Sequence, residues 1–291
     1  MTLKRAIFTI SPGRSGQASL SELLKAAVPD AFVAFEEPQV RRILPGVFGD
    51  IERRIRRRFF ETHELLGRGK VLGAFDAGDT AALSGFAKDR YTWLQRRMRA
   101  MGVEVYIDVS KHFLHGLHTE TVKLLIQSNE LERPIQTIRL VRDPVGNMRS
   151  YLNRKKTYTM DYGRTDGPNN ELILPQETLS KGALYLHAWC ETYLRGERLV
   201  REFGLPAPIE IATGALSHPD KVEELLTQLD VPHNPVPAMG PKNTNIGSGY
   251  GQTAVTEEDV ETFERFRDSL SPDIVSRLPA IFGYDARRKY F

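Results

Sequence analysis

The sequence predicts an α/β fold in which a parallel β-sheet is flanked by helices. Short apolar runs alternate with longer amphipathic segments along most of the chain, which is typical of strands joined by helical crossovers. A chain of 291 residues can bury a substantial core, and we expect one domain spanning residues 1–291. The apolar runs that we interpret as strands are Ala6–Ile10, Ala31–Phe35, Val71–Phe75, Val103–Val109, Ile135–Val141 and Ile209–Ala212.

Three helices and two long loops can be placed between these runs. The helices are expected at Ser19–Ala27, Ala81–Met101 and Leu179–Phe203. Pro, Gly and Asn are concentrated in Tyr162–Pro175 and Val231–Gly251, which indicates loops. Loops of this length inside a compact domain are usually lids or binding segments.

Composition excludes several classes of protein. Lys and Arg number 40 against 37 Asp and Glu, so the total charge does not indicate a nucleic-acid surface and we expect no nucleic-acid partner. The single cysteine, Cys190, cannot form an intrachain disulfide, and its helix-like surroundings predict a packed thiol. No stretch approaches the roughly 18 apolar residues of a membrane-spanning helix. The N-terminus lacks a secretory apolar region, so we expect a soluble, cytoplasmic protein.

Two segments carry the chemistry of anion binding. In Ala6–Gln17 an apolar run breaks into a glycine-rich turn and then into a helical pattern. Backbone N–H groups of such a turn, with the positive end of the next helix, bind phosphate or sulfate, and Arg14 adds charge. In the second segment an apolar run ends in Arg142-Asp143-Pro144, and Ser150 follows eight residues after the arginine. The pairing of the two segments is much rarer than either alone.

With both segments present, the chain resembles the sulfotransferases that use 3'-phosphoadenosine 5'-phosphosulfate (PAPS), closer to their carbohydrate and bacterial types. The resemblance covers most of the chain in order and implies a P-loop-NTPase-like sulfotransferase fold, PAPS as co-substrate and no metal. The first loop would hold the 5'-phosphosulfate, and Arg142 with Ser150 would hold the 3'-phosphate. The resemblance implies donor contacts from Gly13, Arg14, Ser15, Gly16, Gln17, Ala18, Ser19, Arg142, Ser150, Lys242, Asn243 and Asn245.

The first loop departs from the family in one respect. The residues after Ser15-Gly16 are commonly hydroxylic there, whereas this chain has Gln17 and Ala18. The amide of Gln17 or the hydroxyl of Ser19 would have to supply the missing donor.

Phe35-Glu36-Glu37-Pro38 resembles the Phe-Glu-Pro segment of carbohydrate-type sulfotransferases, in which a carboxylate can act as the base. Alignment on Pro38 selects Glu37, and strand alternation places Glu36 on the opposite face. Carboxylates at a helix start are the structural alternative. His112 or His115 could replace Glu37 as the base.

Two cations complete the implied catalytic set. Arg14, with the loop amides, would stabilise the departing phosphate. The resemblance implies that Lys111, after the strand that ends near Asp108, borders the acceptor pocket, and a surface lysine is the alternative. The acceptor would be a small molecule, a carbohydrate or a lipid, bound between Pro38–Arg58, Lys111–His115 and Tyr158–Pro175.

Two rival functions remain. A metal-dependent kinase is suggested because Val103–Asp108 resembles the strand that holds Mg²⁺ in nucleoside triphosphatases. The first loop, however, lacks the Gly-Lys-Ser/Thr ending that a kinase needs. The other rival is a noncatalytic nucleotide-binding or scaffold protein, in which Glu37→Gln would leave function intact.

Two further patterns have a structural and a functional interpretation. His112, His115 and His118 recur at three-residue spacing and could share a helical face, but no carboxylate–histidine zinc signature accompanies them. The arginine-rich run at 52–60 indicates a solvated helix face, or else a site for an anionic acceptor or membrane surface.

Overall fold

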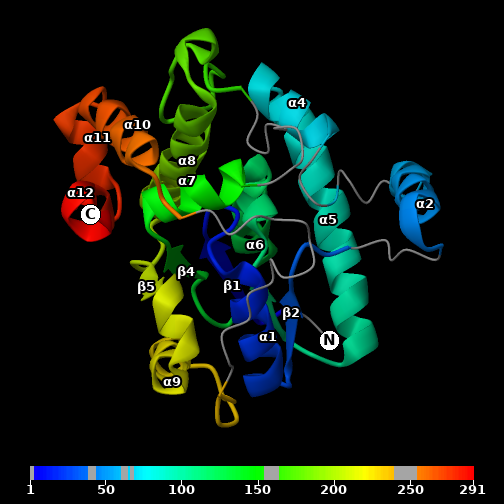
Figure 1. Cartoon of the computed structure of the whole chain (residues 1–291). Coiled ribbons are helices and arrows are strands. Elements are labelled where there is room, and N and C mark those ends of the chain that lie inside the picture. Colours follow the sequence, from blue (N-terminus) through cyan, green and yellow to red (C-terminus); the bar gives the residue numbers. More distant parts are fainter. Residues whose placement is uncertain (1–2, 39–43, 60–64, 66–68, 154–163, 239–253) are drawn as a thin grey trace.

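A five-stranded, all-parallel β-sheet forms the centre of the molecule, in the order β2-β3-β1-β4-β5 (Figure 1). The structure is a computed structural model that describes residues 3–38, 44–59, 65, 69–153, 164–238 and 254–291. The sheet with its flanking helices confirms the predicted α/β class. The strands are β1 (Arg5–Ile10), β2 (Ala31–Ala34), β3 (Val105–Asp108), β4 (Gln136–Val141) and β5 (Ile209–Ala212).

The strand order determines where a ligand can bind. The chain passes from β1 to β2 and β3 on one side of the sheet, then crosses β1 to reach β4 and β5 on the other. In open parallel sheets, ligands bind at the carboxyl ends of strands where the connections diverge in this way. Here that point lies beside β1 and β4, the two strands that precede the predicted anion-binding segments.

Helices cover both faces of the sheet because the side chains of β1 alternate between two hydrophobic clusters. Ile7 packs with residues of α1 and α9, whereas Phe8 and Ile10 pack with residues of α5, α6 and α8. The helices with described bounds are α1 (Gln17–Ala27), α2 (Gly46–Phe59), α4 (Lys70–Ala77), α5 (Thr80–Met101), α6 (His118–Ser128), α7 (Pro144–Leu152), α8 (Lys181–Phe203), α9 (Pro219–Gln228), α10 (Glu257–Asp268), α11 (Pro272–Arg277) and α12 (Ala286–Tyr290). The three predicted helices correspond to α1, α5 and α8 and are confirmed.

The strand predicted at Val71–Phe75 is wrong, because this run lies within helix α4. Val71 and Phe75 are four residues apart and both are buried, so they share one face of a helix, whereas Gly73 between them is exposed. Gly78 ends the helix in the left-handed conformation (φ 71°). An apolar run of five residues does not by itself distinguish a strand from a buried helical turn.

The described parts of the two predicted loops contain neither helix nor strand. These parts are residues 164–175 and 231–238, while the rest of both loops lies outside the described residues. Short 3₁₀ turns follow several strands and loops, namely η1 (Lys111–His115), η2 (Gln176–Thr178), η3 (Thr213–Ser217) and η4 (Ala280–Gly283).

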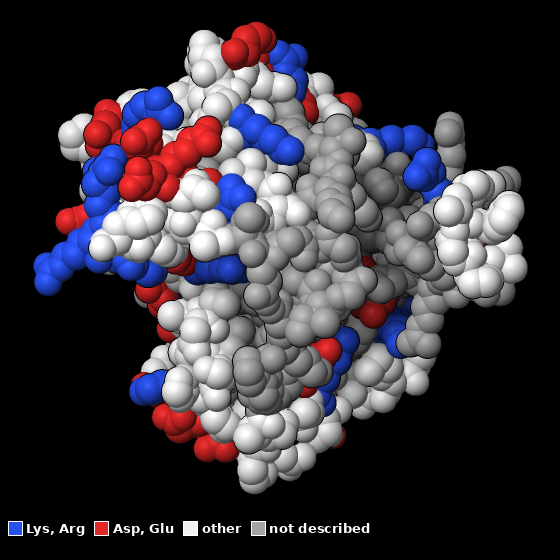
Figure 2. All heavy atoms as spheres, in the orientation of Figure 1, with Lys and Arg blue, Asp and Glu red and all other residues white. Residues whose placement is uncertain are grey.

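Charged side chains of both signs are mixed on the visible surface around α10–α12 (Figure 2). Ion pairs account for part of this mixing, such as Arg287 with Glu264 at 3.0 Å and Arg277 with Glu197 at 2.6 Å. Within the part of the chain that the structure describes, no helix is long and apolar enough to cross a membrane.

Candidate functional site

The glycine-rich turn lies at the carboxyl end of the central strand β1, where the chain enters α1. Its backbone adopts the left-handed region at Arg14 (φ 68°) and Gly16 (φ 90°), on either side of Ser15. A side chain at Gly16 would also be crowded, because an added Cβ would lie 3.0 Å from Cγ2 of Thr213. Left-handed residues that alternate with ordinary ones turn successive N–H groups to one side and form an anion-binding nest. The turn therefore has the backbone shape of an anion cradle.

Gln17, the residue that departs from the family pattern, stabilises the turn from within. Its Nε2 donates to the carbonyl oxygens of Pro12 at 2.7 Å and Ser11 at 3.4 Å. Its Oε1 accepts from the backbone N–H of Ser15 at 3.3 Å. Both the nitrogen and the oxygen of the buried Gln17 amide thus bond to the backbone of the loop, which fixes the shape of the loop without a ligand.

Gly13 allows two side chains to approach the turn closely. A Cβ added there would lie 1.9 Å from the hydroxyl oxygen of Tyr151 and 2.9 Å from Cδ of Lys111. Lys111 is only 9% exposed, so it lies against the cradle and is not a surface lysine. The Tyr151 ring is also held in place, because it stacks on Tyr185 at a centroid distance of 4.5 Å.

Helix α7 brings Asn147 to the same turn. The Nδ2 of Asn147 donates to the carbonyl oxygen of Gly13 and to Oγ of Ser15, both at 3.0 Å. Neither anion-binding sequence segment singles out Asn147. Its position supplied a signal, because Asn147 lies one helical turn before Ser150 and residues three apart share a helix face.

The arginines of the two predicted segments meet at the cradle. Nη1 of Arg142 donates to the carbonyl oxygen of Arg14 at 2.5 Å, and Nε of Arg14 donates to Oγ of Ser150 at 3.2 Å. Burial, followed by the positive charge of Arg14, lowers the pKa of Arg142 from its usual value. Two neighbouring guanidinium groups repel each other, so a bound anion would stabilise this arrangement.

Asp143 holds the start of α7. Its carboxylate accepts from the backbone N–H of Gly146 at 2.7 Å, from the Tyr290 hydroxyl at 2.8 Å, and from the Lys289 ammonium. Burial alone would raise the pKa of Asp143, but these hydrogen bonds outweigh burial and hold that pKa below its usual range. The C-terminal helix α12 therefore fixes the element that carries Asn147 and Ser150.

The candidate base residues lie at the ends of β2 and β3. Strand β2 ends at Ala34, and Glu36 has a positive φ of 52°, so strand alternation does not extend to Glu36 and Glu37. The backbone N–H of Glu36 donates to Oγ of Ser110 at 2.6 Å. Its Oε1 lies 3.5 Å from Nε2 of His112, which is almost fully buried.

The three histidines that recur in the sequence do not share one site in the structure. His112 and His115 lie together in η1, with their Nδ1 atoms 3.1 Å apart. His118 is separate and packs between the rings of Phe75 and Phe113. The described residues contain no group of three or more His, Cys, Asp or Glu side chains arranged to hold a metal ion.

Asp108, which suggested a kinase, has structural partners for both carboxylate oxygens. Oδ2 accepts from Nη2 of Arg90 at 2.8 Å and from the Tyr106 hydroxyl at 2.7 Å. Oδ1 accepts from the backbone N–H of Ser110 at 2.8 Å. The buried ion pair connects β3 to α5, and this role explains an aspartate at the strand end without a metal.

A second buried ion pair ties η1 to the loop at residues 164–174. Arg195 and Glu191, both fully buried in α8, pair at 2.6 Å. Arg195 also donates to the carbonyl oxygen of Leu114 and to Oδ1 of Asn170, at 2.9 and 2.8 Å. Glu191 accepts from the backbone N–H of Leu172 at 2.9 Å. The sequence motifs do not single out this pair; the available signal is two opposite charges one turn apart in an amphipathic helix.

Some of the remaining predicted site residues lie near the cradle, and others lie outside the residues that the structure describes. Ala18 and Ser19 are in the first turn of α1, beside the cradle. Lys242, Asn243 and Asn245 lie outside the described residues. Cys190 is a packed thiol as predicted, and burial raises its pKa well above the usual value.

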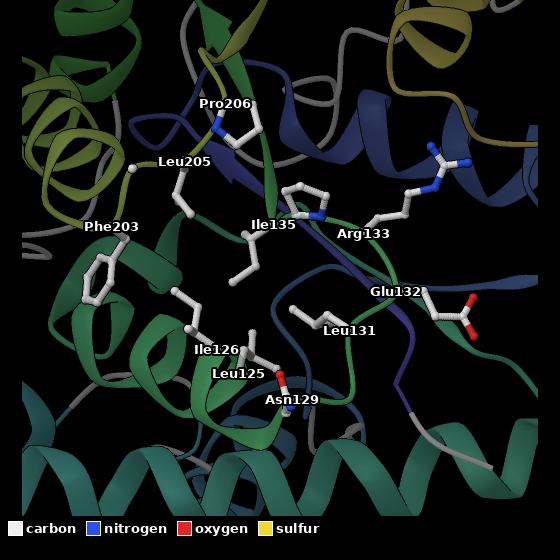
Figure 3. Close-up of a pocket in the computed structure, with 12 residues that line it drawn as sticks. Leu125, Ile126, Asn129, Leu131, Glu132, Arg133, Ile135, Phe203, Leu205 and Pro206 are labelled. Carbon is white, nitrogen blue, oxygen red and sulfur yellow. The ribbon is translucent and has the colours of Figure 1, made fainter.

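One cavity lies away from the cradle, near the amino ends of the strands rather than their carboxyl ends. It has a volume of about 360 Å³ and is lined by Ile126, Leu131, Ile135 and Phe203, among others (Figure 3). Ile135 precedes β4, so the cavity borders the amino ends of the strands. Arg133 at its rim pairs with Asp230 at 2.8 Å.

Comparison with known proteins gave matches among solved structures only. The sequence matches no protein-family model and no curated protein. A sulfotransferase domain from the curacin biosynthetic pathway is 14% identical, with a TM-score of 0.45, and the match covers 91% of this chain and 98% of that chain. A sulfotransferase from Alicyclobacillus acidocaldarius is 14% identical, with a TM-score of 0.45 and 98% coverage of both chains. The sulfotransferase domain of the Synechococcus PCC 7002 olefin synthase is 14% identical, with a TM-score of 0.39 and coverage of 93% of this chain and 97% of that chain. Each of these three matches extends over at least 91% of this chain, at 14% sequence identity.

Proposed function

We propose that this protein is a sulfotransferase that moves a sulfuryl group from PAPS to a hydroxyl or amine acceptor. The observation that carries the proposal is the meeting of Arg14, Arg142 and Ser150, which come from two segments 128 or more residues apart in the chain. Such a cluster supplies hydrogen-bond donors and positive charge for a ligand with phosphate at two positions. Proteins that bind a single phosphate need only the first turn.

The donor would occupy the cradle with its 5'-phosphosulfate at residues 13–19 and its 3'-phosphate at Arg142 and Ser150. Two observations support this placement of PAPS. The turn already has the shape of an anion-binding nest, and the positive charges of Arg14 and Arg142 lie close enough to repel each other. When bound, PAPS supplies a sulfuryl group whose bond to the 5'-phosphate oxygen breaks as the acceptor oxygen or nitrogen bonds to sulfur.

The residues of this chain have three tasks in that reaction. Arg14, Lys111 and the loop N–H groups stabilise the negative charge that develops on the departing phosphate. Asn147 holds the loop in the shape that presents those groups. A base takes the proton of the acceptor, which is the task of Glu37 or of the Glu36–His112 pair.

The acceptor is proposed to be a carbohydrate, lipid or other small molecule whose hydroxyl or amine group reaches the Glu36–His112 pair or Glu37. The buried Asp108 gives the kinase reading no specific support, because its oxygens are engaged by Arg90, Tyr106 and Ser110. The single-domain organisation and the cytoplasmic location expected from the sequence stay predictions.

The proposal is tested by incubating the purified chain with ³⁵S-labelled PAPS and a panel of hydroxylated sugars, lipids, phenols and amines. Transfer of label to at least one acceptor, without added divalent metal, is expected. Glu37→Gln, Glu36→Gln and His112→Asn should then identify the base, because loss of a general base slows turnover by about 10²–10⁴-fold. Magnesium-dependent ATP consumption without any sulfuryl transfer would instead support a kinase.

A further inference from the structure

Helix α2 (Gly46–Phe59) carries an apolar face that the described protein leaves open to solvent. Four of its apolar side chains are among the most exposed in the structure. Their exposed fractions are 73% for Val47, 75% for Phe48, 49% for Ile51 and 52% for Ile55. Positions 47, 48, 51 and 55 follow the helical period, so these side chains form one continuous stripe.

No other described helix or strand packs extensively against α2. In Figure 1, α2 stands at the edge of the molecule, apart from the sheet and from α5. An apolar stripe exposed to this extent indicates a binding surface, because the stripes of core helices are buried.

The charge of α2 indicates what the stripe binds. Its sequence contains five arginines, at positions 53, 54 and 56–58, against two carboxylates, Asp50 and Glu52. Glu52 is already paired with Arg56 at 3.2 Å, and Arg54 is exposed. Figure 2 shows the α2 end of the molecule as an uncharged lobe with basic side chains beside it. The partner should therefore combine an apolar interior with a negatively charged surface.

We propose that α2 docks this protein on an anionic lipid surface, with the apolar stripe inserted among the acyl chains and the arginines at the headgroups. Basic amphipathic helices of low overall hydrophobicity lie in the membrane interface in this way. A second copy of the chain fits less well. In a twofold symmetric contact, the stripe would bring two sets of five arginines together, and their charges would repel.

The proposal is tested by sedimenting the full chain with vesicles in the absence of donor and acceptor, so that the result is independent of sulfuryl transfer. Vesicles contain phosphatidylcholine alone or with about three parts in ten phosphatidylserine. We expect at least about tenfold stronger binding to the anionic vesicles, decreasing as salt is added.

Matched variants distinguish specific binding through the apolar stripe of α2 from nonspecific adsorption to vesicles. Ile55→Asp should weaken binding to anionic vesicles by at least about tenfold, and Arg54→Glu should weaken it in the same direction. Ile126→Asp and Arg99→Glu, which change an exposed isoleucine on α6 and an exposed arginine on α5, should bind within about twofold of the parent chain. Circular dichroism checks that each variant keeps its fold.

Three results would overturn the proposal. One is equal or absent binding to the two vesicle types. Another is unchanged binding of Ile55→Asp. The third is self-association in sedimentation velocity that Ile55→Asp abolishes while vesicles are not bound, which would assign the stripe to a second copy of this chain.

Discussion

At the scale of single residues, the cradle depends on how closely side chains approach its backbone. Lys111 and Tyr151 lie against the Cα of Gly13, and Asn147 binds its carbonyl oxygen. The sequence predicts site roles for Gly13, Arg14 and Lys111, and in the structure Lys111 lies close to Gly13. The sequence did not identify Tyr151 or Asn147, because their approach to the loop depends on how α7 is oriented.

Gly13→Ala tests this close packing. The new methyl group would overlap the Tyr151 hydroxyl and press on Lys111, and overpacking of this kind costs about 1–3 kcal/mol in the free energy of unfolding. Urea denaturation measures that loss, and calorimetry should show weaker binding of 3'-phosphoadenosine 5'-phosphate (PAP). In Gly85→Ala, the added methyl group meets no atom within 4 Å, and the better helix propensity should stabilise the chain by about 0.5–1 kcal/mol. A Gly13→Ala chain that binds PAP normally would contradict the close contact.

Because His118 is buried, we expect the chain to lose stability in mild acid. Neither ring nitrogen has a hydrogen-bond partner among the described residues. Burial, followed by the charges of Arg195 and Arg198, lowers the pKa of His118 well below 6.5. The folded chain therefore keeps this ring neutral, whereas the unfolded chain protonates it below about pH 6.5.

The free energy of unfolding should consequently fall as the pH decreases below 6.5, by up to about 1.4 kcal/mol per pH unit for this residue. His118→Leu should reduce the slope by that amount, measured as urea unfolding between about pH 5 and 8. An unchanged slope in His118→Leu would show that the ring is protonated in the folded chain.

At the scale of elements, helix α8 holds the loop at residues 164–174 and the turn η1 in one arrangement. The sequence predicted α8 from its amphipathic pattern and length. It did not predict that Glu191 and Arg195 point into the core, because charged residues at i,i+4 are usually on the solvent side. The run Val71–Phe75 shows the same limit, since its burial in a helix depends on its contacts with α5 and with Gly116.

Arg195→Met tests the buried pair. Removing one partner leaves the Glu191 carboxylate buried without its counter-charge, which typically costs about 3–5 kcal/mol. Urea denaturation should show that loss. Arg201→Met removes the arginine of an exposed i,i+4 pair on the same helix and should cost less than about 1 kcal/mol. Equal effects of the two substitutions would contradict the structural role of the buried pair.

At the scale of the whole molecule, the strand order brings together segments that are distant in the sequence. The structure confirms five of the six predicted strands and the parallel sheet, because apolar runs and helical crossovers leave a clear pattern in the sequence. The order β2-β3-β1-β4-β5 was not predictable from that pattern. It is this order that places β1 beside β4, and therefore Arg14 beside Arg142 and Ser150.

Ser150→Ala tests the junction between the two segments. It removes the hydroxyl that accepts from Nε of Arg14, so PAP should bind about two- to tenfold more weakly, in line with the net value of one hydrogen bond. Ser276→Ala removes a hydroxyl that bonds to a carbonyl oxygen of its own helix, and PAP affinity should not change. Calorimetric titration measures both variants, and equal affinities would remove Ser150 from the donor site.

The central claim is that the two segments form one site for a nucleotide with phosphates at both the 5' and 3' positions. The most direct measurement is a calorimetric comparison of PAP with adenosine 5'-monophosphate, which lacks the 3'-phosphate, on the parent chain and on Arg142→Ala. We predict that PAP binds at least about tenfold more tightly to the parent chain and that Arg142→Ala abolishes the difference. Equal affinity of the parent chain for the two nucleotides would contradict the claim.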